Sequence, residues 1–309
     1  MSTQPISPDF NAKAQSPTEL AVSMLKAIRG RDANEQAAIE ILAAGADAQY
    51  MTADGRTLLD AAVVTGFPLL TKELILKGAD PNRKNEKGRY SLSLAVAWNF
   101  TDIIEVLIDN GANPDIASDG GDPVLVMALM YSSGHETAKL LLNKGANPNI
   151  TYGASQMTPL MLVCEKGDEA AIKMLLEAGA DPLKKDAQGN DAFDYAKKHN
   201  PETFAFMTGL CHDIFLQPDK TPAERAAYMA KVMWEGKAKA DEKALLAMLE
   251  VGADVRYMEE RGRSLLDYAA IFGFADLTKK LIEKGADPNQ MNPSGSYPIV
   301  YAAYRKGLS

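Results

Sequence analysis

Few residues in this sequence are of the types that carry out covalent or metal chemistry, and their spacing does not favour it. The chain has two cysteines and three histidines, and their tightest cluster is Cys211-His212-Asp213. Catalytic groups are normally brought together by the fold rather than by adjacency in sequence, and zinc sites use spaced cysteine pairs. The sequence therefore predicts plain helix residues here, with no catalytic residue, metal or cofactor.

The acidic pair in Asp119-Gly120-Gly121-Asp122 lacks the pattern of a calcium loop. Calcium-binding EF-hand loops place carboxylates at alternate positions and close with a glutamate, and neither feature follows here. Glycine-rich phosphate loops and dinucleotide-binding fingerprints are also absent from the sequence. We interpret this segment as the tip of a hairpin-like loop.

Composition excludes several classes of partner. The chain has 309 residues, 46% of them hydrophobic, and a net charge of −8. Acidic residues are interspersed among the basic ones, so we expect no nucleic-acid partner. No signal peptide or membrane-spanning stretch is visible, and we expect no membrane contact. Two cysteines suit a reducing compartment, so we expect a cytoplasmic protein or one delivered into a host cell by a signal-less route.

One short motif recurs along most of the chain. It reads Gly-Ala-Asp or Gly-Ala-Asn and begins at Gly45, Gly78, Gly111, Gly145, Gly179, Gly252 and Gly285. The intervals are 33, 33, 34, 34, 73 and 33 residues, which is the signature of a repeat protein. Each motif follows a short apolar helix pattern, and its glycine suits the left-handed turn that ends a helix. About ten residues later a second glycine turn precedes another helix pattern.

The repeats resemble the ankyrin family. The segment from Asp54 to Ala62, with Gly66 and then Gly78 to Asn82, follows the family pattern, and so does Thr158-Pro159-Leu160-Met161 with Gly167. The resemblance covers roughly residues 17 to 309. It implies an all-α fold, an ankyrin-repeat solenoid of stacked helix-turn-helix units with hairpin-like loops.

No repeat keeps the histidine of the family's Thr-Pro-Leu-His tetrapeptide. Aspartate replaces it at Asp60, Asp194 and Asp267. The hydrogen bonds that tie each first helix to its neighbour must therefore be weakened or rebuilt.

The beginning of the array recurs late in the chain. Ser16-Pro17-Thr18-Glu19 is matched by Thr221-Pro222-Ala223-Glu224, and both are capping boxes with proline at the first helical position. Further matches, such as Gly55 with Gly262, are 207 residues apart. We predict a disordered leader at 1–15, a first array at 16–216, a short connection at 217–220, and a second array at 221–309 that duplicates 17–98.

The second array is expected to end in half a repeat that carries Tyr297, Tyr301 and Tyr304. A terminal repeat needs a polar outer face or a partner. This feature leaves open a self-assembling scaffold, with a homodimer formed through residues 297–309.

The resemblance implies that another protein binds the concave groove and the loop tips, as an adaptor, inhibitor or effector. Placed on this sequence, the partner-binding residues are Arg56, Lys87, Arg89, Trp98, Met130, Tyr131, Lys166, Arg263, Phe272 and Tyr304. For the exposed aromatic positions, core packing between repeats is the alternative. A less favoured hypothesis is an enzyme whose site lies in the irregular region at 191–220.

Overall fold

The chain forms two compact units of stacked helix pairs. A computed structural model describes residues 15–29, 33–130, 134–199, 201–236, 240–298 and 300–301. Unit 1 comprises residues 1–159 and 177–180, and unit 2 comprises residues 160–176 and 181–309. We describe each unit by itself.

The described residues contain sixteen α-helices. In unit 1 they are α1 (Pro17–Ile28), α2 (Glu35–Ala43), α3 (Leu58–Thr65), α4 (Pro68–Leu76), α5 (Ser91–Ala97), α6 (Thr101–Asp109), α7 (Val124–Met130) and α8 (His135–Asn143). In unit 2 they are α9 (Pro159–Lys166), α10 (Glu169–Glu177), α11 (Ala192–His199), α12 (Pro201–Phe215), α13 (Pro222–Gly236), α14 (Glu242–Glu250), α15 (Leu265–Phe272) and α16 (Ala275–Glu283). The predicted all-α helical-repeat fold is confirmed.

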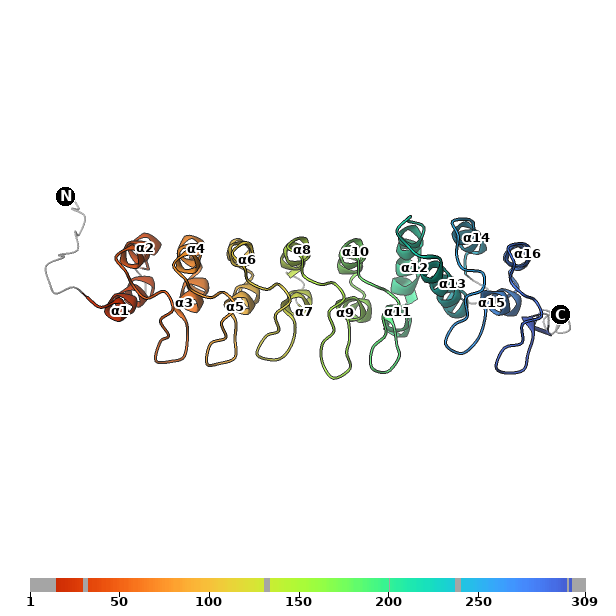
Figure 1. The fold of residues 1–309 in the computed structure, drawn as a ribbon, viewed down its shortest axis with the longest axis horizontal. Coiled ribbons are helices and arrows are strands. Elements are labelled where there is room, and N and C mark those ends of the chain that lie inside the picture. The colour runs from red at the N-terminus through yellow and green to blue at the C-terminus, as the bar shows by residue number, and fades with distance from the viewer. Residues whose placement is uncertain are drawn as a thin grey trace. The chain divides into compact units, whose positions relative to one another are not determined.

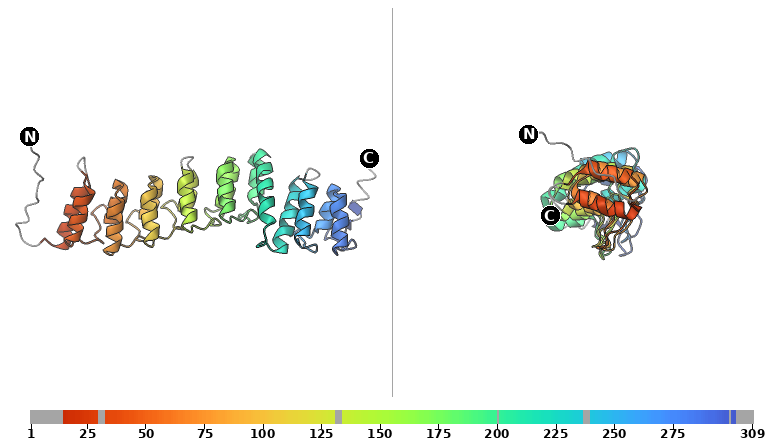
Figure 2. Two further views of the ribbon diagram at one scale, coloured as in Figure 1. Left: turned by 90° about the horizontal axis from the view of Figure 1, so that it is seen from above. Right: turned by 90° about the vertical axis from the view of Figure 1, so that its left-hand side faces the viewer.

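Within each unit the odd-numbered and even-numbered helices form two layers, and hairpin loops project from one side (Figures 1 and 2). We call these loops fingers. In the first finger the amide of Thr52 donates to the carbonyl of Arg56 at 2.8 Å, and Gly55 closes the turn with a φ of 73°. The finger before α15 repeats this bond between Glu259 and Arg263 at 2.9 Å.

The predicted helix-ending turns are present. Gly78 has a φ of 100°, a backbone conformation in which a side chain would be strained. Its amide donates to the carbonyl of Ile75 at 2.9 Å, and the amide of Ala79 donates to Leu74 at 2.9 Å. These bonds satisfy carbonyls that the end of α4 leaves open.

Aspartate has rebuilt the network that the family's histidine would supply. Asp60 is fully buried on α3. Its carboxylate accepts from the amide of Thr57 at 3.1 Å, from the side chain of Asn85 at 3.0 Å and from the hydroxyl of Ser91 at 2.8 Å. Asn85 and Ser91 belong to the next repeat, so a single carboxylate joins two repeats. Asp267 also accepts from Ser264, but its Oδ1 is buried and has no hydrogen-bond partner among the described residues.

The duplicated segments share specific hydrogen bonds. The amide of Leu70 donates to Glu35 at 2.9 Å, and that of Leu277 donates to Glu242 at 2.9 Å, which is 207 residues on. The bond from Asp47 to the carbonyl of Pro17 recurs as the bond from Asp254 to Pro222. Asp254 lies 207 residues after Asp47, whereas Pro222 lies only 205 residues after Pro17. The stretch from the start of the first helix to the start of the second is therefore two residues longer in the second copy, and α13 has 15 residues where α1 has 12.

Both predicted capping boxes form. Ser16 and Glu19 exchange hydrogen bonds at the start of α1, and Thr221 and Glu224 do the same at the start of α13. The face of α13 that meets the preceding helix α12 is nevertheless covered.

Tyr228 makes that covering contact. Its ring stacks on Phe215 of α12 with a centroid distance of 4.5 Å, and its hydroxyl donates to the carbonyl of Thr208 at 2.7 Å. Ser23 holds the corresponding position in α1. The predicted connection at 217–220 thus lies inside unit 2, and the two-array division remains a prediction.

Parts of the predicted ends fall outside the described residues. These parts are the leader up to residue 14 and the terminal segment from residue 302, with Tyr304. Among the residues that the structure does describe, no helix is both long and apolar enough to cross a membrane. The homodimer through 297–309 stays a prediction.

The paired aspartates allow a matched stability test. We expect Asp60→Ala to lower the free energy of unfolding by about 3–5 kcal/mol, because three buried donors lose their acceptor. Asp267→Ala should cost about 1–2 kcal/mol, because one of its oxygens is already unpaired. Urea denaturation followed by circular dichroism measures both, and equal costs would contradict the role given to Asp60.

Candidate protein-binding surface

The predicted arginines on the fingers of unit 1 each form an ion pair with a carboxylate of the same chain. Arg56 pairs with Asp54 at 3.3 Å, and Arg89 pairs with Asp119 at 2.8 Å. A hydrogen bond from Arg89 is the main cause that holds the pKa of Asp119 below its usual value. Both pairs are largely exposed, so they add little stability. They do, however, neutralise two side chains that were predicted to meet a partner.

Two predicted groove residues of unit 1 are exposed apolar side chains. Trp98 follows the last turn of α5 and is 60% exposed, and Met130 ends α7 and is 40% exposed. The helices α5 and α7 pack against each other, so both residues lie at the same end of neighbouring helices. Trp98 stacks on Phe100 with a centroid distance of 6.4 Å. We call Trp98 and Met130 the Trp98 patch.

The other predicted residues contribute less to a surface that can be described. Lys87 lies on the second finger and Lys166 at the end of α9, and both are exposed. Tyr131 and Tyr304 lie outside the described residues. Neither lysine belongs to an aromatic cluster among the described residues.

Unit 2 brings together the remaining two predicted residues, Arg263 and Phe272, with two that sequence reasoning missed. Trp234 of α13 lies 6.1 Å from Tyr268 and 6.5 Å from Phe272, both of α15, measured between ring centroids. The Arg263 guanidinium lies 5.4 Å from the centre of the Trp234 ring and 6.0 Å from that of Tyr268. We call these four residues the Trp234 cluster.

The Trp234 cluster has one buried side chain and three side chains that solvent can reach. Tyr268 is only 4% exposed, whereas Trp234 is 37% exposed and Phe272 and Arg263 are half-buried. Burial raises the pKa of Tyr268, and the negative charge of the nearby Glu259 carboxylate raises it further. Tyr268 therefore stays a neutral phenol that supports the other two rings.

The first copy has nothing comparable at the corresponding positions. Arg29, Ala61 and Thr65 occupy the places of Trp234, Tyr268 and Phe272. Ala61 and Thr65 lie on α3 as Tyr268 and Phe272 lie on α15, so these two rings are a change of side chains on a common scaffold. Arg29 ends α1 with an extended backbone, whereas Trp234 lies inside the longer helix α13. A position-by-position comparison of the two copies is the sequence signal that would have revealed Trp234 and Tyr268.

A buried charge network holds α13, which carries Trp234. Lys231 pairs with Asp191 at 2.9 Å and with Asp194 at 2.8 Å, and both acids flank the start of α11. Glu235 lies 3.7 Å from the same ammonium group. Burial tends to lower the pKa of Lys231, but the attraction of Asp191 and Asp194 outweighs it and the pKa is raised. Lys26, the matching residue of α1, is exposed.

Other features of the described residues do not support a catalytic or small-molecule site. Cys211 is fully buried and burial raises the pKa of its thiol, so it is a poor nucleophile. Its neighbour Asp213 is exposed on a different side of α12. Within the described ranges no group of histidine, cysteine and carboxylate side chains could hold a metal ion.

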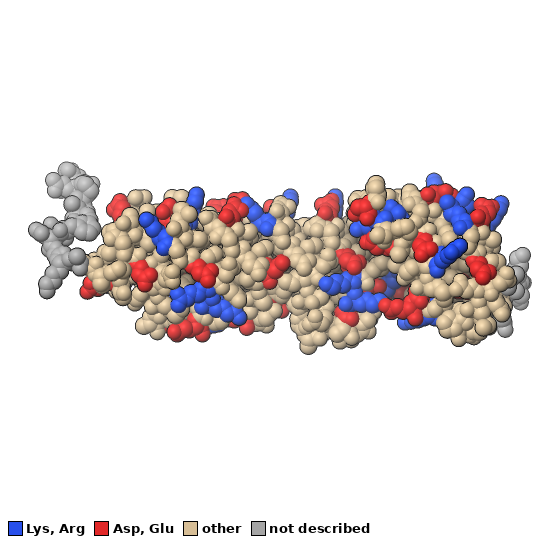
Figure 3. All heavy atoms as spheres, in the orientation of Figure 1, with Lys and Arg blue, Asp and Glu red and all other residues tan. Residues whose placement is uncertain are grey.

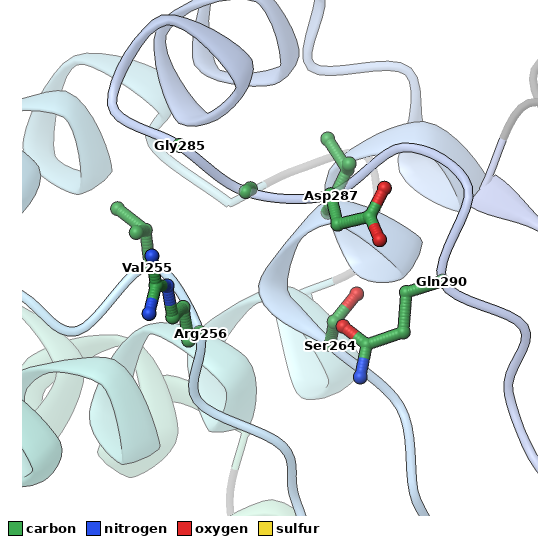
Figure 4. Close-up of a pocket in the computed structure, with 8 residues that line it drawn as sticks. Val255, Arg256, Ser264, Gly285, Asp287 and Gln290 are labelled. Carbon is green, nitrogen blue, oxygen red and sulfur yellow. The ribbon is translucent and has the colours of Figure 1, made fainter.

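A small pocket lies between two loops of unit 2 (Figure 4). Ser264 and Gln290 line one side and Arg256 the other, and the volume is about 280 Å³. In the first copy Arg83 spans the equivalent space and donates to the carbonyl of Gln49 at 3.1 Å. The volume is below the range of about 300–1,000 Å³ that is usual for small-molecule sites.

Charges of both signs alternate on the face shown in Figure 3, over both units. Lys185 of one finger pairs with Glu260 of another, which illustrates how the basic side chains are neutralised. This face offers no continuous basic surface of the kind that a phosphate backbone needs.

Comparison with known proteins gives matches to two related sequence families. The family described as "Ankyrin repeats (3 copies)" matches residues 59–152 and 125–212, and the family described as "Ankyrin repeat" matches residues 261–293. No curated protein matches the chain.

One solved structure similar to the chain is the complex of a predatory endopeptidase from Bdellovibrio bacteriovorus with an immunity protein. The match has 27% sequence identity and covers 62% of this chain and 96% of the matched one, with a TM-score of 0.48. A TM-score of this size does not establish a shared arrangement of the helices.

The network under α13 can be tested with its own matched control. We expect Lys231→Met to lower the free energy of unfolding by about 3–5 kcal/mol, because Asp191 and Asp194 lose their shared cation, whereas Glu235 keeps its ion pair with Lys197. Lys26→Met, at the exposed position of α1, should change it by less than about 0.5 kcal/mol. Chemical denaturation of the full chain measures both, and similar values for the two variants would show that the network is not structural.

Proposed function

Because this chain belongs to the ankyrin-repeat family, we propose that it is a non-catalytic module that binds another protein. The family's scaffold is generic, and function lies in the side chains that it presents. We assign the partner contact to the groove positions of unit 2, centred on the Trp234 cluster. The observation that carries this proposal is an exposed aromatic surface that one copy of a duplicated segment has and the other lacks.

The physical properties of the cluster support this assignment. Tryptophan, tyrosine and arginine dominate the energetics of protein interfaces, because they bury a large area at little cost in rotamer entropy. The buried ring of Tyr268 forms the base of the cluster and contacts both Trp234 and Phe272, so these two rings are ordered before a partner arrives. Pre-ordered side chains lose little entropy on binding.

The Trp98 patch of unit 1 is a second contact in this proposal. Its two side chains are more exposed than Trp234, but no ring other than Phe100 is paired with Trp98 within the described part of unit 1. We further propose that the protein acts as an adaptor or inhibitor in a reducing compartment such as the cytoplasm. The burial of both of its free cysteines is consistent with that setting.

Removal of the two accessible rings tests the proposed surface. We expect Trp234→Ala with Phe272→Thr to reduce recovery of the partner at least about tenfold in affinity capture, because two anchor side chains are lost. The full chain serves as bait in extracts of the cells that produce it, and quantitative mass spectrometry measures the recovered proteins. The control is Thr65→Ala, at the position in unit 1 that corresponds to Phe272.

A parallel variant, Trp98→Ala with Met130→Ala, measures the contribution of unit 1. Circular dichroism and thermal unfolding must show that each variant is folded. Full recovery of every partner by the folded Trp234→Ala, Phe272→Thr variant would overturn the assignment to unit 2.

A further inference from the structure

Three fingers carry an arginine directly after their turn glycine, at Arg56, Arg89 and Arg263. The first two each have a carboxylate of the chain within 3.3 Å. Arg263 makes no ion pair with any residue that the structure describes. The three side chains start from the same backbone position, so the difference lies in what surrounds them.

Substitutions around Arg263 have removed the acids that its counterpart meets. Asp54, which pairs with Arg56, corresponds to Arg261 in the second copy. Glu86 of the next finger, whose amide bonds to the carbonyl of Gly55, corresponds to Pro293. The second copy has therefore lost both of these carboxylates. It has gained Glu259 and Glu260 where the first copy has Thr52 and Ala53, and neither of them pairs with Arg263 among the described residues.

The guanidinium of Arg263 is held on aromatic faces instead. It lies over the rings of Trp234 and Tyr268, at 5.4 and 6.0 Å from their centres. A guanidinium that stacks on an aromatic ring still points its N–H groups outward in its own plane. These groups can therefore pair with an anion. Glu259 is the nearest acid of this finger that influences Tyr268, and it forms no ion pair with Arg263 among the described residues. Its Oε1 atom is buried and has no hydrogen-bond partner there.

The neighbouring surface adds positive charge. Arg261 and Arg256 are exposed in the same repeat, where the first copy has Asp54 and Gln49. Glu260 of this finger is already paired with Lys185. An incoming carboxylate thus meets three arginines that form no ion pair with another described residue, next to the accessible rings of Trp234 and Phe272.

We propose that the Trp234 cluster recognises a protein segment in which an aspartate or glutamate stands beside a large apolar side chain. The carboxylate pairs with Arg263, and the apolar side chain packs on Trp234 and Phe272. This inference rests on the proposed function and adds the chemistry of the partner. A bidentate arginine–carboxylate pair on a partly dried aromatic surface gives both affinity and orientation.

The native partner is not needed for the test. Short random peptides are selected on the full chain and counter-selected on the Trp234→Ala, Phe272→Thr variant. We expect the enriched peptides to carry an acidic residue next to leucine, isoleucine or phenylalanine. Enrichment of peptides without acidic residues would overturn the proposal.

The chain's own tryptophans provide the binding signal. Trp98 and Trp234 are its two tryptophans, so Trp98→Phe leaves Trp234 as the sole tryptophan, whose fluorescence is excited selectively over that of the tyrosines. In that background we expect Arg263→Gln to weaken binding of an enriched peptide about tenfold or more, whereas Arg56→Gln leaves it unchanged. Replacing the peptide's glutamate with glutamine should cause the same loss.

A double-mutant cycle then decides whether the two groups meet. With Arg263→Gln present, the glutamine peptide should bind no more weakly than the glutamate peptide. Losses that simply multiply would show that the carboxylate pairs elsewhere and would overturn the proposal.

The two proposals fail in distinguishable ways. If Trp234→Ala with Phe272→Thr abolishes binding and Arg263→Gln does not, the surface is correct and the carboxylate recognition is wrong. If neither variant differs from the Arg56→Gln control, or if no peptide is enriched, the groove of unit 2 is not the binding surface and both proposals fall.

Discussion

No helix pair in this chain can bury its own apolar face, so each depends on the next pair for its core. Residues that link neighbouring helix pairs are therefore buried. Asp60 is an example, because even its charged side chain has no exposed surface. Its one carboxylate satisfies donors of its own repeat and of the following one. A repeat that is copied to a new place in the chain must therefore form packing contacts with its new neighbours.

The first helix of the second copy illustrates that consequence. In the first copy, no helix pair that the structure describes precedes α1 and covers Ser23 and Lys26. In the second copy, Tyr228 is buried against α12, and Lys231 is half-buried and pairs with the acids at the start of α11. The capping box at the start of the helix was retained, while its outer face was rebuilt for packing. Near the C-terminal end of α13, by contrast, Trp234 has replaced a residue of the first copy without becoming buried, and it remains partly exposed. Packing therefore explains Tyr228 and Lys231 but does not explain Trp234.

Sequence reasoning predicted the repeat fold well, because its signals are local. A glycine that must adopt a positive φ, a hydroxyl and a carboxylate three residues apart, and an apolar helix face are each visible in a short window. The family follows from several such signals at fixed offsets. The sequence also predicted that the missing histidine would require a rebuilt network, but the partners of Asp60 come from the next repeat and could not be named.

The candidate surface was only half predictable. Arg263 and Phe272 stand at positions that the family pattern marks, whereas Trp234 lies on a helix that resembles a cap, which the pattern does not assign to the groove. The exposure of Trp98 and the neutralisation of Arg56 and Arg89 depend on side-chain neighbours from other fingers. Pairings of that kind are set by the stacking of repeats and are not encoded at a fixed spacing.

The most direct test of the central claim is a photo-crosslinking measurement at two matched positions. A photoreactive phenylalanine analogue is placed at Phe272 in one form of the full chain and at Thr65 in another, and each is irradiated in the cells that produce the protein. Our account predicts a defined crosslinked protein from position 272 and none of it from position 65. Crosslinking of that protein from position 65 alone, or no crosslink from position 272, would contradict the claim that the second copy's aromatic cluster is the binding surface.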